Sequence, residues 1–204
     1  MAKLFGNLHL VLAIGLVAAI AVMLGFGAEV PVDVNSVFRW LHVFFGILWI
    51  GLLYYLNFVQ VPTMPSIPAE QKGAITGHIA PKVFFFFRWA ALLTVVTGLV
   101  IAYVTGYVHR ALIFQGLNLH ENLIGLGMDL ALIMAFNVWF IIWPAQKKIL
   151  GIVEASAEEK AAAAPRALIA SRTNLLLSLP MLYCMVSANL GSVSYTHLTL
   201  PTKA

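Results

Sequence analysis

The chain has 204 residues, of which 61% are hydrophobic and only 10% are charged. Soluble domains carry about 25% charged residues, so this composition excludes a disordered chain, a coiled coil and a soluble nucleic-acid-binding protein. It indicates an integral membrane protein, because its repeated apolar runs of about 20 residues match the thickness of a bilayer. The net charge of +4 is then explained by Lys and Arg residues in cytoplasmic loops. The single cysteine, Cys184, excludes an internal disulfide, a Cys-rich zinc site and a C-x-x-C-H haem attachment.

Five apolar segments predict an all-α integral membrane protein, a bundle of about five transmembrane helices in one domain over residues 1–192. In chain order they are residues 8–28, 37–61, 83–104, 122–143 and 173–188. A cleaved signal peptide is the rival interpretation of the first segment. We favour a retained helix, because the run is long for a signal-peptide core and residues 26–28 form a poor cleavage site.

Prolines set the expected helix ends. Pro62, Pro65 and Pro68 are expected to end the second helix and shape its loop, and Pro144 to end the fourth. Pro180 should kink the fifth. The stretch between the fourth and fifth segments, residues 145–171, is rich in alanine and charged residues. It predicts a long loop that carries a short surface helix.

The last twelve residues, 193–204, read VSYTHLTLPTKA. This stretch resembles the in-frame translation of a sequencing adapter, so we interpret it as an artefactual tail and exclude it from the fold. An ordinary polar C-terminal tail is the alternative.

Basic residues predict the orientation of the chain. Eight lie at the N-terminus or in the loops after the second and fourth segments, and two, Arg39 and Arg110, lie on the other side. The eight are Lys3, Lys72, Lys82, Lys147, Lys148, Lys160, Arg166 and Arg172. Because basic loops stay in the cytoplasm, we expect a multi-pass protein of a bacterial inner membrane, with its N-terminus inside and its C-terminus in the periplasm.

One face of the second segment carries polar and small residues at steps of three and four. They are Arg39, His42, Gly46, Trp49, Leu53, Asn57 and Gln60. An ionisable group at membrane depth is costly and usually faces a cavity. This face therefore predicts a cofactor site formed by Arg39, His42, Gly46 and Trp49, with His42 as the metal ligand of a haem or as a proton carrier. A seam of interhelical hydrogen bonds is the alternative.

Two further ionisable groups lie inside predicted spans. Arg88 either snorkels to the cytoplasmic interface or faces inward and binds an anion. Asp129 must be paired or neutral, and a salt bridge to Arg39 or Arg88 is the alternative to an acid–base role. We therefore predict His42, Arg88 and Asp129 as catalytic residues.

Other groups that could bind a metal or haem give weaker signals. His78 is interpreted as an interfacial histidine, and His120–Glu121 is a weak metal motif. Met181 and Met185 are interpreted as packing residues, with an axial haem ligand as the less favoured use.

Four motifs occur in a recognisable order: FRWLHVFFGILWIGLLYYLNFVQVP, FFFFRWAALLTVVTG, MAFNVWFIIWPAQKKILG and SRTNLLLSLPMLYCMVSANL. Together they resemble the membrane-bound urate hydroxylase family (PuuD-like), that is, the urate oxidase N-terminal domain, over about residues 37–190. The start of the second helix also resembles, more distantly, haem-binding membrane proteins of the HemJ and copper-resistance type.

The resemblance implies oxidation of urate to 5-hydroxyisourate, with electrons passed to a cytochrome c. Since the sequence contains no C-x-x-C-H, haem c would be on a missing C-terminal domain or a partner. Urate is a planar anion, and the expected substrate-binding residues are Arg88, Trp89, Asn57 and Asn137. No dinucleotide or flavin motif is present, so haem b bound through His42 is the simplest acceptor of the electrons.

The alternative is a haem-binding electron-transfer or metal-handling protein without urate activity. The expected partners are urate, cytochrome c and the lipid bilayer, with no nucleic acid.

Overall fold

The computed structural model describes residues 5–25, 32–113, 115 and 119–190. All regular structure within these ranges is helical, which confirms the predicted all-α class. Five helices among them are long and apolar enough to cross a membrane. The expected artefactual tail, residues 193–204, lies outside the described residues. The chain divides into two compact units, residues 1–37 and 38–204, and each is described by itself.

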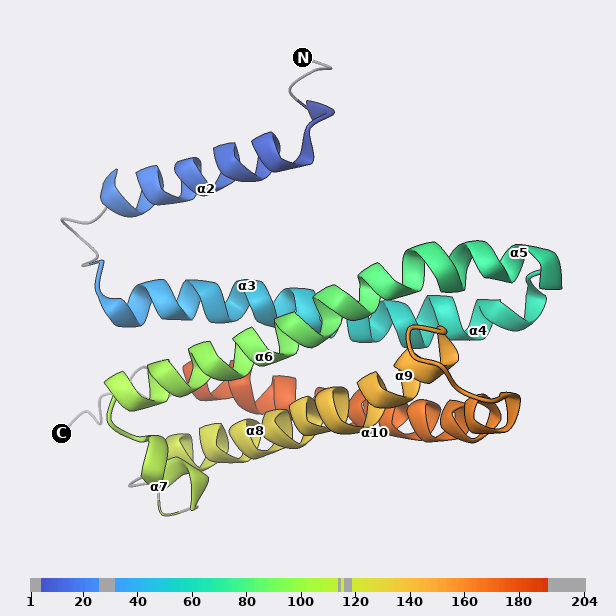
Figure 1. Ribbon diagram of the computed structural model, residues 1–204. Helices are drawn as coiled ribbons and strands as arrows, with labels where there is room; N and C mark the ends of the chain where they lie inside the picture. The colour runs from blue at the N-terminus through green and yellow to red at the C-terminus, as the bar shows by residue number, and fades with distance from the viewer. Residues whose placement is uncertain (1–4, 26–31, 114, 116–118, 191–204) are drawn as a thin grey trace, which may run out of the picture. The chain divides into compact units, whose positions relative to one another are not determined.

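Unit 1 contains α2, Leu8–Gly25, drawn in dark blue in Figure 1. No side chain of α2 is buried, and the helix is apolar on all sides. A helix that is hydrophobic all round suits a bilayer rather than water. The last three residues of the predicted first span, 26–28, lie outside the described residues.

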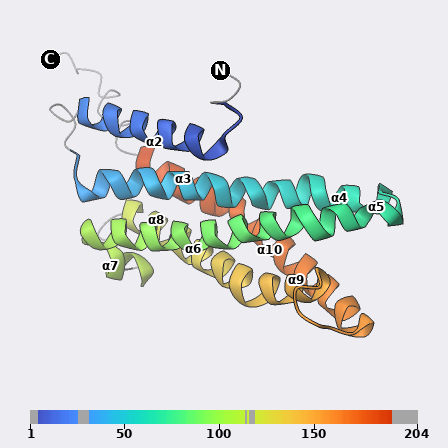
Figure 2. The same cartoon turned by 45° about the horizontal axis from the view of Figure 1, so that its top comes forward.

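Unit 2 consists of four long helical segments whose chain direction alternates (Figures 1 and 2). The first segment begins in unit 1 with α3, Val34–Tyr54, and continues as η1, Tyr55–Gln60, α4, Val61–Thr63, and η2, Met64–Ser66. The second is α5, Ala69–Ala74, η3, Ile75–Ile79, and α6, Ala80–Val104. The third is α8, Leu119–Phe136, η4, Asn137–Ile142, and α9, Trp143–Ile149. The fourth is α10, Ala157–Leu190, and the short helix α7, Val108–Leu112, joins the second to the third.

Three of these segments pass through a π-helical turn next to a proline. The turns η1, η3 and η4 precede Pro62, Pro81 and Pro144. Proline lacks an N–H and its ring crowds the carbonyl four residues earlier, and a π turn absorbs this mismatch without ending the helix. The prediction that Pro144 ends its helix is therefore wrong. For the same reason His78 and Lys82, expected in a loop, lie within a continuous helical segment. The predicted second helix runs past Pro62 but ends at Ser66, between Pro65 and Pro68.

The loop predicted over residues 145–171 is also shorter than expected. Its first part forms α9, and its alanine-rich part forms the start of α10, which then runs on through the predicted fifth span. Pro165 and Pro180 lie inside α10. Small side chains explain the close approach of the two helices, because Ala145 of α9 is buried against Ala163 and Ala167 of α10.

The main core lies toward the half of unit 2 that contains η1, η4 and α9, which we call the α9 end. Its largest buried side chains include Trp49, Phe87 and Met134. A smaller core at the opposite end, the α7 end, joins Ala102, Ala111, Ile124, Met128 and Ala188. Between these two cores the helices enclose a cavity.

Candidate functional site

A cavity of about 1020 Å³ lies between α3, α6, α8 and α10 of unit 2. This volume is at the upper end of the range for small-molecule and cofactor sites, roughly 300–1,000 Å³. Most of its lining is apolar, and its polar groups come from the following residues: Arg39, His42, Trp49, Tyr54, Thr94, Thr105, Tyr107, His120 and Glu121. The cavity thus brings together all four residues predicted to bind a cofactor, since Gly46 also lines it.

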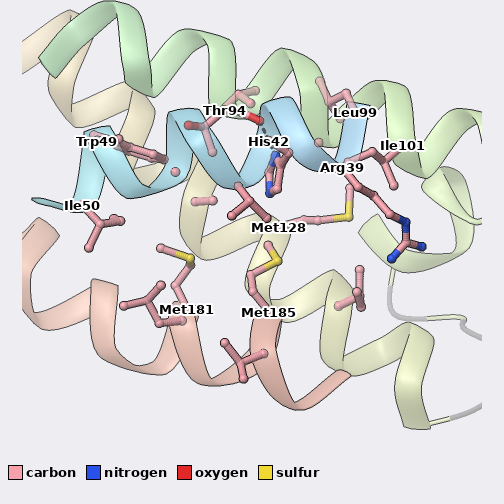
Figure 3. Close-up of a pocket in the computed structure, with 18 of the residues that line it drawn as sticks. Arg39, His42, Trp49, Ile50, Thr94, Leu99, Ile101, Met128, Met181 and Met185 are labelled. Carbon is pink, nitrogen blue, oxygen red and sulfur yellow. Dashed lines mark hydrogen bonds between the residues drawn. The ribbon is translucent and has the colours of Figure 1, made fainter. Parts of the chain in front are cut away.

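His42 projects from α3 into this cavity (Figure 3). Its Nδ1 lies 2.9 Å from the carbonyl oxygen of Thr94 and 3.2 Å from Oγ1 of Thr97. A carbonyl oxygen only accepts hydrogen bonds, so Nδ1 carries the proton. In the neutral ring Nε2 is then unprotonated, and it points into the cavity. In metal sites, the ring nitrogen of a histidine that does not bind the metal often donates to a backbone carbonyl, and this bond orients the imidazole. His42 has the same hydrogen bond.

Two glycines make room for this ring and for a ligand. A Cβ atom at Gly98 of α6 would lie only 2.9 Å from Cε1 of His42, so the imidazole fits only against a residue without a side chain. Gly46, one turn along α3 from His42, leaves the wall of the cavity open, since its nearest neighbour would be a methyl group of Thr94 at 4.0 Å. A flat ligand can therefore approach the α3 backbone beside His42.

Charged and polar groups gather where the cavity reaches the α7 end. Arg39, Tyr107, His120 and Glu121 line this part of it. Glu121 accepts hydrogen bonds from Nε and Nη2 of Arg110 at 3.1 and 3.0 Å, and these bonds raise the pKa of the Arg110 guanidinium. Burial raises the pKa of the Tyr107 phenol, so this hydroxyl stays protonated and can donate a hydrogen bond. No sequence pattern points to Tyr107, and only a weak metal motif points to His120 and Glu121.

Trp49 lies toward the other end of the cavity. Its side chain is 1% exposed, and its indole N–H has no hydrogen-bond partner among the described residues. A buried donor without a partner is costly. A ligand with a hydrogen-bond acceptor would satisfy it.

The predicted substrate-binding residues do not line this cavity and lie toward the α9 end. The guanidinium carbon of Arg88 lies 3.9 Å from the ring centre of Trp143 and 5.4 Å from that of Phe85. The indole of Trp139 donates to the Arg88 carbonyl at 3.0 Å. Trp89 is 41% exposed and meets Trp139 edge to face. Arg88 is therefore held by aromatic rings and not beside His42.

Asn57 of η1 and Asn137 of η4 belong to buried hydrogen-bond networks. Asn57 donates to the Leu53 carbonyl and to Oγ of Ser171, both at 2.9 Å. Asn137 donates to Oδ1 of Asn174 at 2.9 Å, and Asn174 donates to the Met134 carbonyl at the same distance. These bonds hold α3 and α8 against α10. Asn137 also lines a second hollow, of about 480 Å³, between the third segment and α10.

Asp129 lies on α8, adjacent in sequence to Met128 of the cavity wall, but does not line the cavity. Its side chain is half-buried. Within the part of the chain that the structure describes, it makes no ion pair with Arg39 or Arg88. The three predicted catalytic residues, His42, Arg88 and Asp129, are thus not brought together. The proposed salt bridge to Arg39 or Arg88 is not formed either.

Sequence reasoning missed part of the cavity wall opposite α3. Met128 of α8 lines the cavity together with Met181 and Met185 of α10. The sequence predicts Met181 and Met185 as packing residues, and no sequence pattern points to Met128. Metal-binding groups of three or more His, Cys, Asp or Glu side chains are absent from the described residues. His78 is exposed in η3 and lies outside the cavity.

Comparison with known proteins gives one family match. Residues 113–200 match the model of the family described as "Urate oxidase N-terminal". This match includes the α8 and α10 walls of the cavity, whereas α3 and α6 precede it. No curated protein and no solved structure matches the chain.

Proposed function

Because residues 113–200 match the model of the urate oxidase N-terminal family, we propose that this chain is the membrane part of a urate-oxidising enzyme with haem b in the cavity of unit 2. The observation that carries the proposal is the setting of His42. Its Nδ1–H donates a hydrogen bond to the Thr94 carbonyl at 2.9 Å. The lone pair of Nε2 is therefore free to bind a ligand in the large apolar cavity.

The residues present fit a haem. Nε2 of His42 would bind the iron, Gly46 would admit the flat ring, and Arg39 near the α7 end would pair with a propionate. Thr94 and Thr97 hold the imidazole in the required tautomer. A haem bound there would supply a one-electron acceptor.

Urate and water give 5-hydroxyisourate, two protons and two electrons, so the reaction needs an anion site near the acceptor. Arg88, the cationic side chain predicted to bind urate, does not line the cavity that contains His42, whereas Arg39 does. We therefore place urate at the α7 end of the cavity, beside Arg39. In this position the protonated Tyr107 hydroxyl and the His120 ring can bind its oxygen atoms.

The electrons would leave to a cytochrome c on the side of the α7 end. This side carries few basic residues, and the charge count predicts that it faces the periplasm of a bacterial inner membrane. The cavity reaches this end through Arg39, His120 and Glu121.

A haem-binding electron-transfer or haem- and metal-handling membrane protein is the second candidate function. The observation in its favour is that two predicted catalytic groups, Arg88 and Asp129, lie outside the cavity that contains His42. Such a protein needs the haem site alone.

The test is to purify the chain in detergent from cells that make haem, and to add urate and ferricytochrome c. We expect a Soret band, cytochrome reduction that depends on urate, and formation of 5-hydroxyisourate. His42→Ala should remove all three, whereas His78→Ala, a change at an exposed histidine outside the cavity, should leave them intact. A Soret band without urate turnover would favour the second candidate. Wild-type protein without any Soret band would overturn the haem site.

A further inference from the structure

The wall of the cavity opposite α3 is formed partly by three methionines. Met128 belongs to α8, and Met181 and Met185 belong to α10. In Figure 3 their thioethers line the side of the cavity that faces His42. A thioether is a soft ligand that binds haem iron or copper and does not need to be deprotonated.

The three methionines differ in depth. Along the helices in Figure 3, His42 lies level with Met128 and Met185, whereas Met181 lies nearer Trp49. Met185 is at a similar level to Met128, because a Cβ atom at the neighbouring Gly127 would lie 3.1 Å from its methyl carbon. Met181 is one turn further from the α7 end. Met128 and Met185 are therefore the two at the level of His42.

The side chains of Met128 and Met185 differ in the contacts they make. The thioether of Met185 packs across Gly127 of α8, where a Cβ atom would lie 3.5 Å from its sulfur. Met128 is 9% exposed, and in Figure 3 its thioether extends from α8 toward the α3 wall, where His42 and Arg39 project.

We propose that the thioether of Met128, together with Nε2 of His42, would hold the iron of a haem bound in this cavity. This inference rests on the haem site of the proposed function. Histidine–methionine ligation raises the reduction potential of a haem, which suits an acceptor that must take electrons from a neutral or anionic organic ring. Met128 would then set the potential, and His42 would hold the iron.

The experiment compares absorption, near-infrared magnetic circular dichroism and redox titration of the wild-type chain with Met128→Leu, a change that nearly conserves volume. Wild-type protein should be low-spin and show the thioether-to-iron charge-transfer band. Met128→Leu should keep its haem, lose this band, become high-spin and bind carbon monoxide or added imidazole more readily. Met181→Leu is the matched control one turn deeper, and it should leave the spectrum unchanged.

Met128→His provides a second variant in case Met128→Leu folds poorly. It should remain low-spin, lose the charge-transfer band and show a lower midpoint potential. An unchanged charge-transfer band in both Met128 variants, or its loss in Met185→Leu instead, would overturn the role of Met128 and leave the haem site standing. Wild-type protein without haem would overturn both proposals, and the absence of a Soret band identifies that case.

Discussion

The Nδ1 atom of His42 on α3 lies 2.9 Å from the main-chain carbonyl oxygen of Thr94 on α6. Thr94 can offer this contact while its own hydroxyl donates to the Ala90 carbonyl at 2.7 Å. Oγ1 of Thr97, whose proton goes to the carbonyls of α6, adds a second acceptor at 3.2 Å. One helix thus fixes the tautomer of a histidine on another, and the second ring nitrogen is left for a ligand.

We predict that Gly98→Ala displaces the His42 ring. The added methyl group would lie 2.9 Å from Cε1 and 3.2 Å from Nδ1 of His42, so the ring or α6 must move. Overpacking of this kind costs about 1–3 kcal/mol. The expected result is a lower unfolding midpoint and a weakened or shifted Soret band.

Gly73→Ala is the matched control for this change, because a Cβ atom there meets nothing within 4 Å. It should keep the spectrum and gain slightly in stability through its helix propensity. A Soret band in Gly98→Ala identical to that of the wild type would show that the position of His42 does not depend on Gly98.

We predict that Arg88 and Asp129 contribute to stability independently. Arg88 stacks on Trp143 at 3.9 Å and makes no ion pair with Asp129 among the described residues. Arg88→Gln should cost about 0.5–2 kcal/mol through the lost cation–π contact. The double variant Arg88→Gln/Asp129→Asn should match the sum of the single changes within about 0.5 kcal/mol. Recovery of folded yield in the double variant would instead demonstrate a structural pair.

We predict that Asn174→Leu destabilises the bundle by about 1–3 kcal/mol. It removes the acceptor of the Asn137 amide and the donor to the Met134 carbonyl, so both of these buried groups lose a hydrogen bond. Unfolding in mixed micelles measures the effect. Lys160→Gln, a change at an exposed residue of α10, provides a control that leaves the buried network intact. Equal stability of Asn174→Leu and this control would contradict the prediction.

We predict that a periplasmic reporter fused after Ala188 of α10 is active. The prediction follows from eight basic residues on the expected cytoplasmic side against two on the other. A cytoplasmic reporter at the same position should be inactive, and the reverse pattern would invert the orientation of all five candidate spans.

The sequence alone determined the helical class and the number of candidate spans, because the length and hydropathy of each run follow from composition. It also determined the face of α3 that carries Arg39, His42, Gly46 and Trp49, since residues at steps of three and four share a face of any helix. The ends of the helices were harder to predict from the sequence. Whether a proline ends a helix or is absorbed by a π turn depends on packing against neighbouring helices, as at Pro144.

Only the tertiary structure decided which helices meet this face. His42 faces the Thr94 carbonyl because Gly98 admits its ring, and Met128 lies across the cavity because α8 and α10 pack closely at Gly127. The sequence did not predict that Arg88 lies apart from His42 either. Spacing within one helix follows from the rise per residue, whereas the depth and rotation of one helix against another depend on side-chain contacts between residues far apart in the chain.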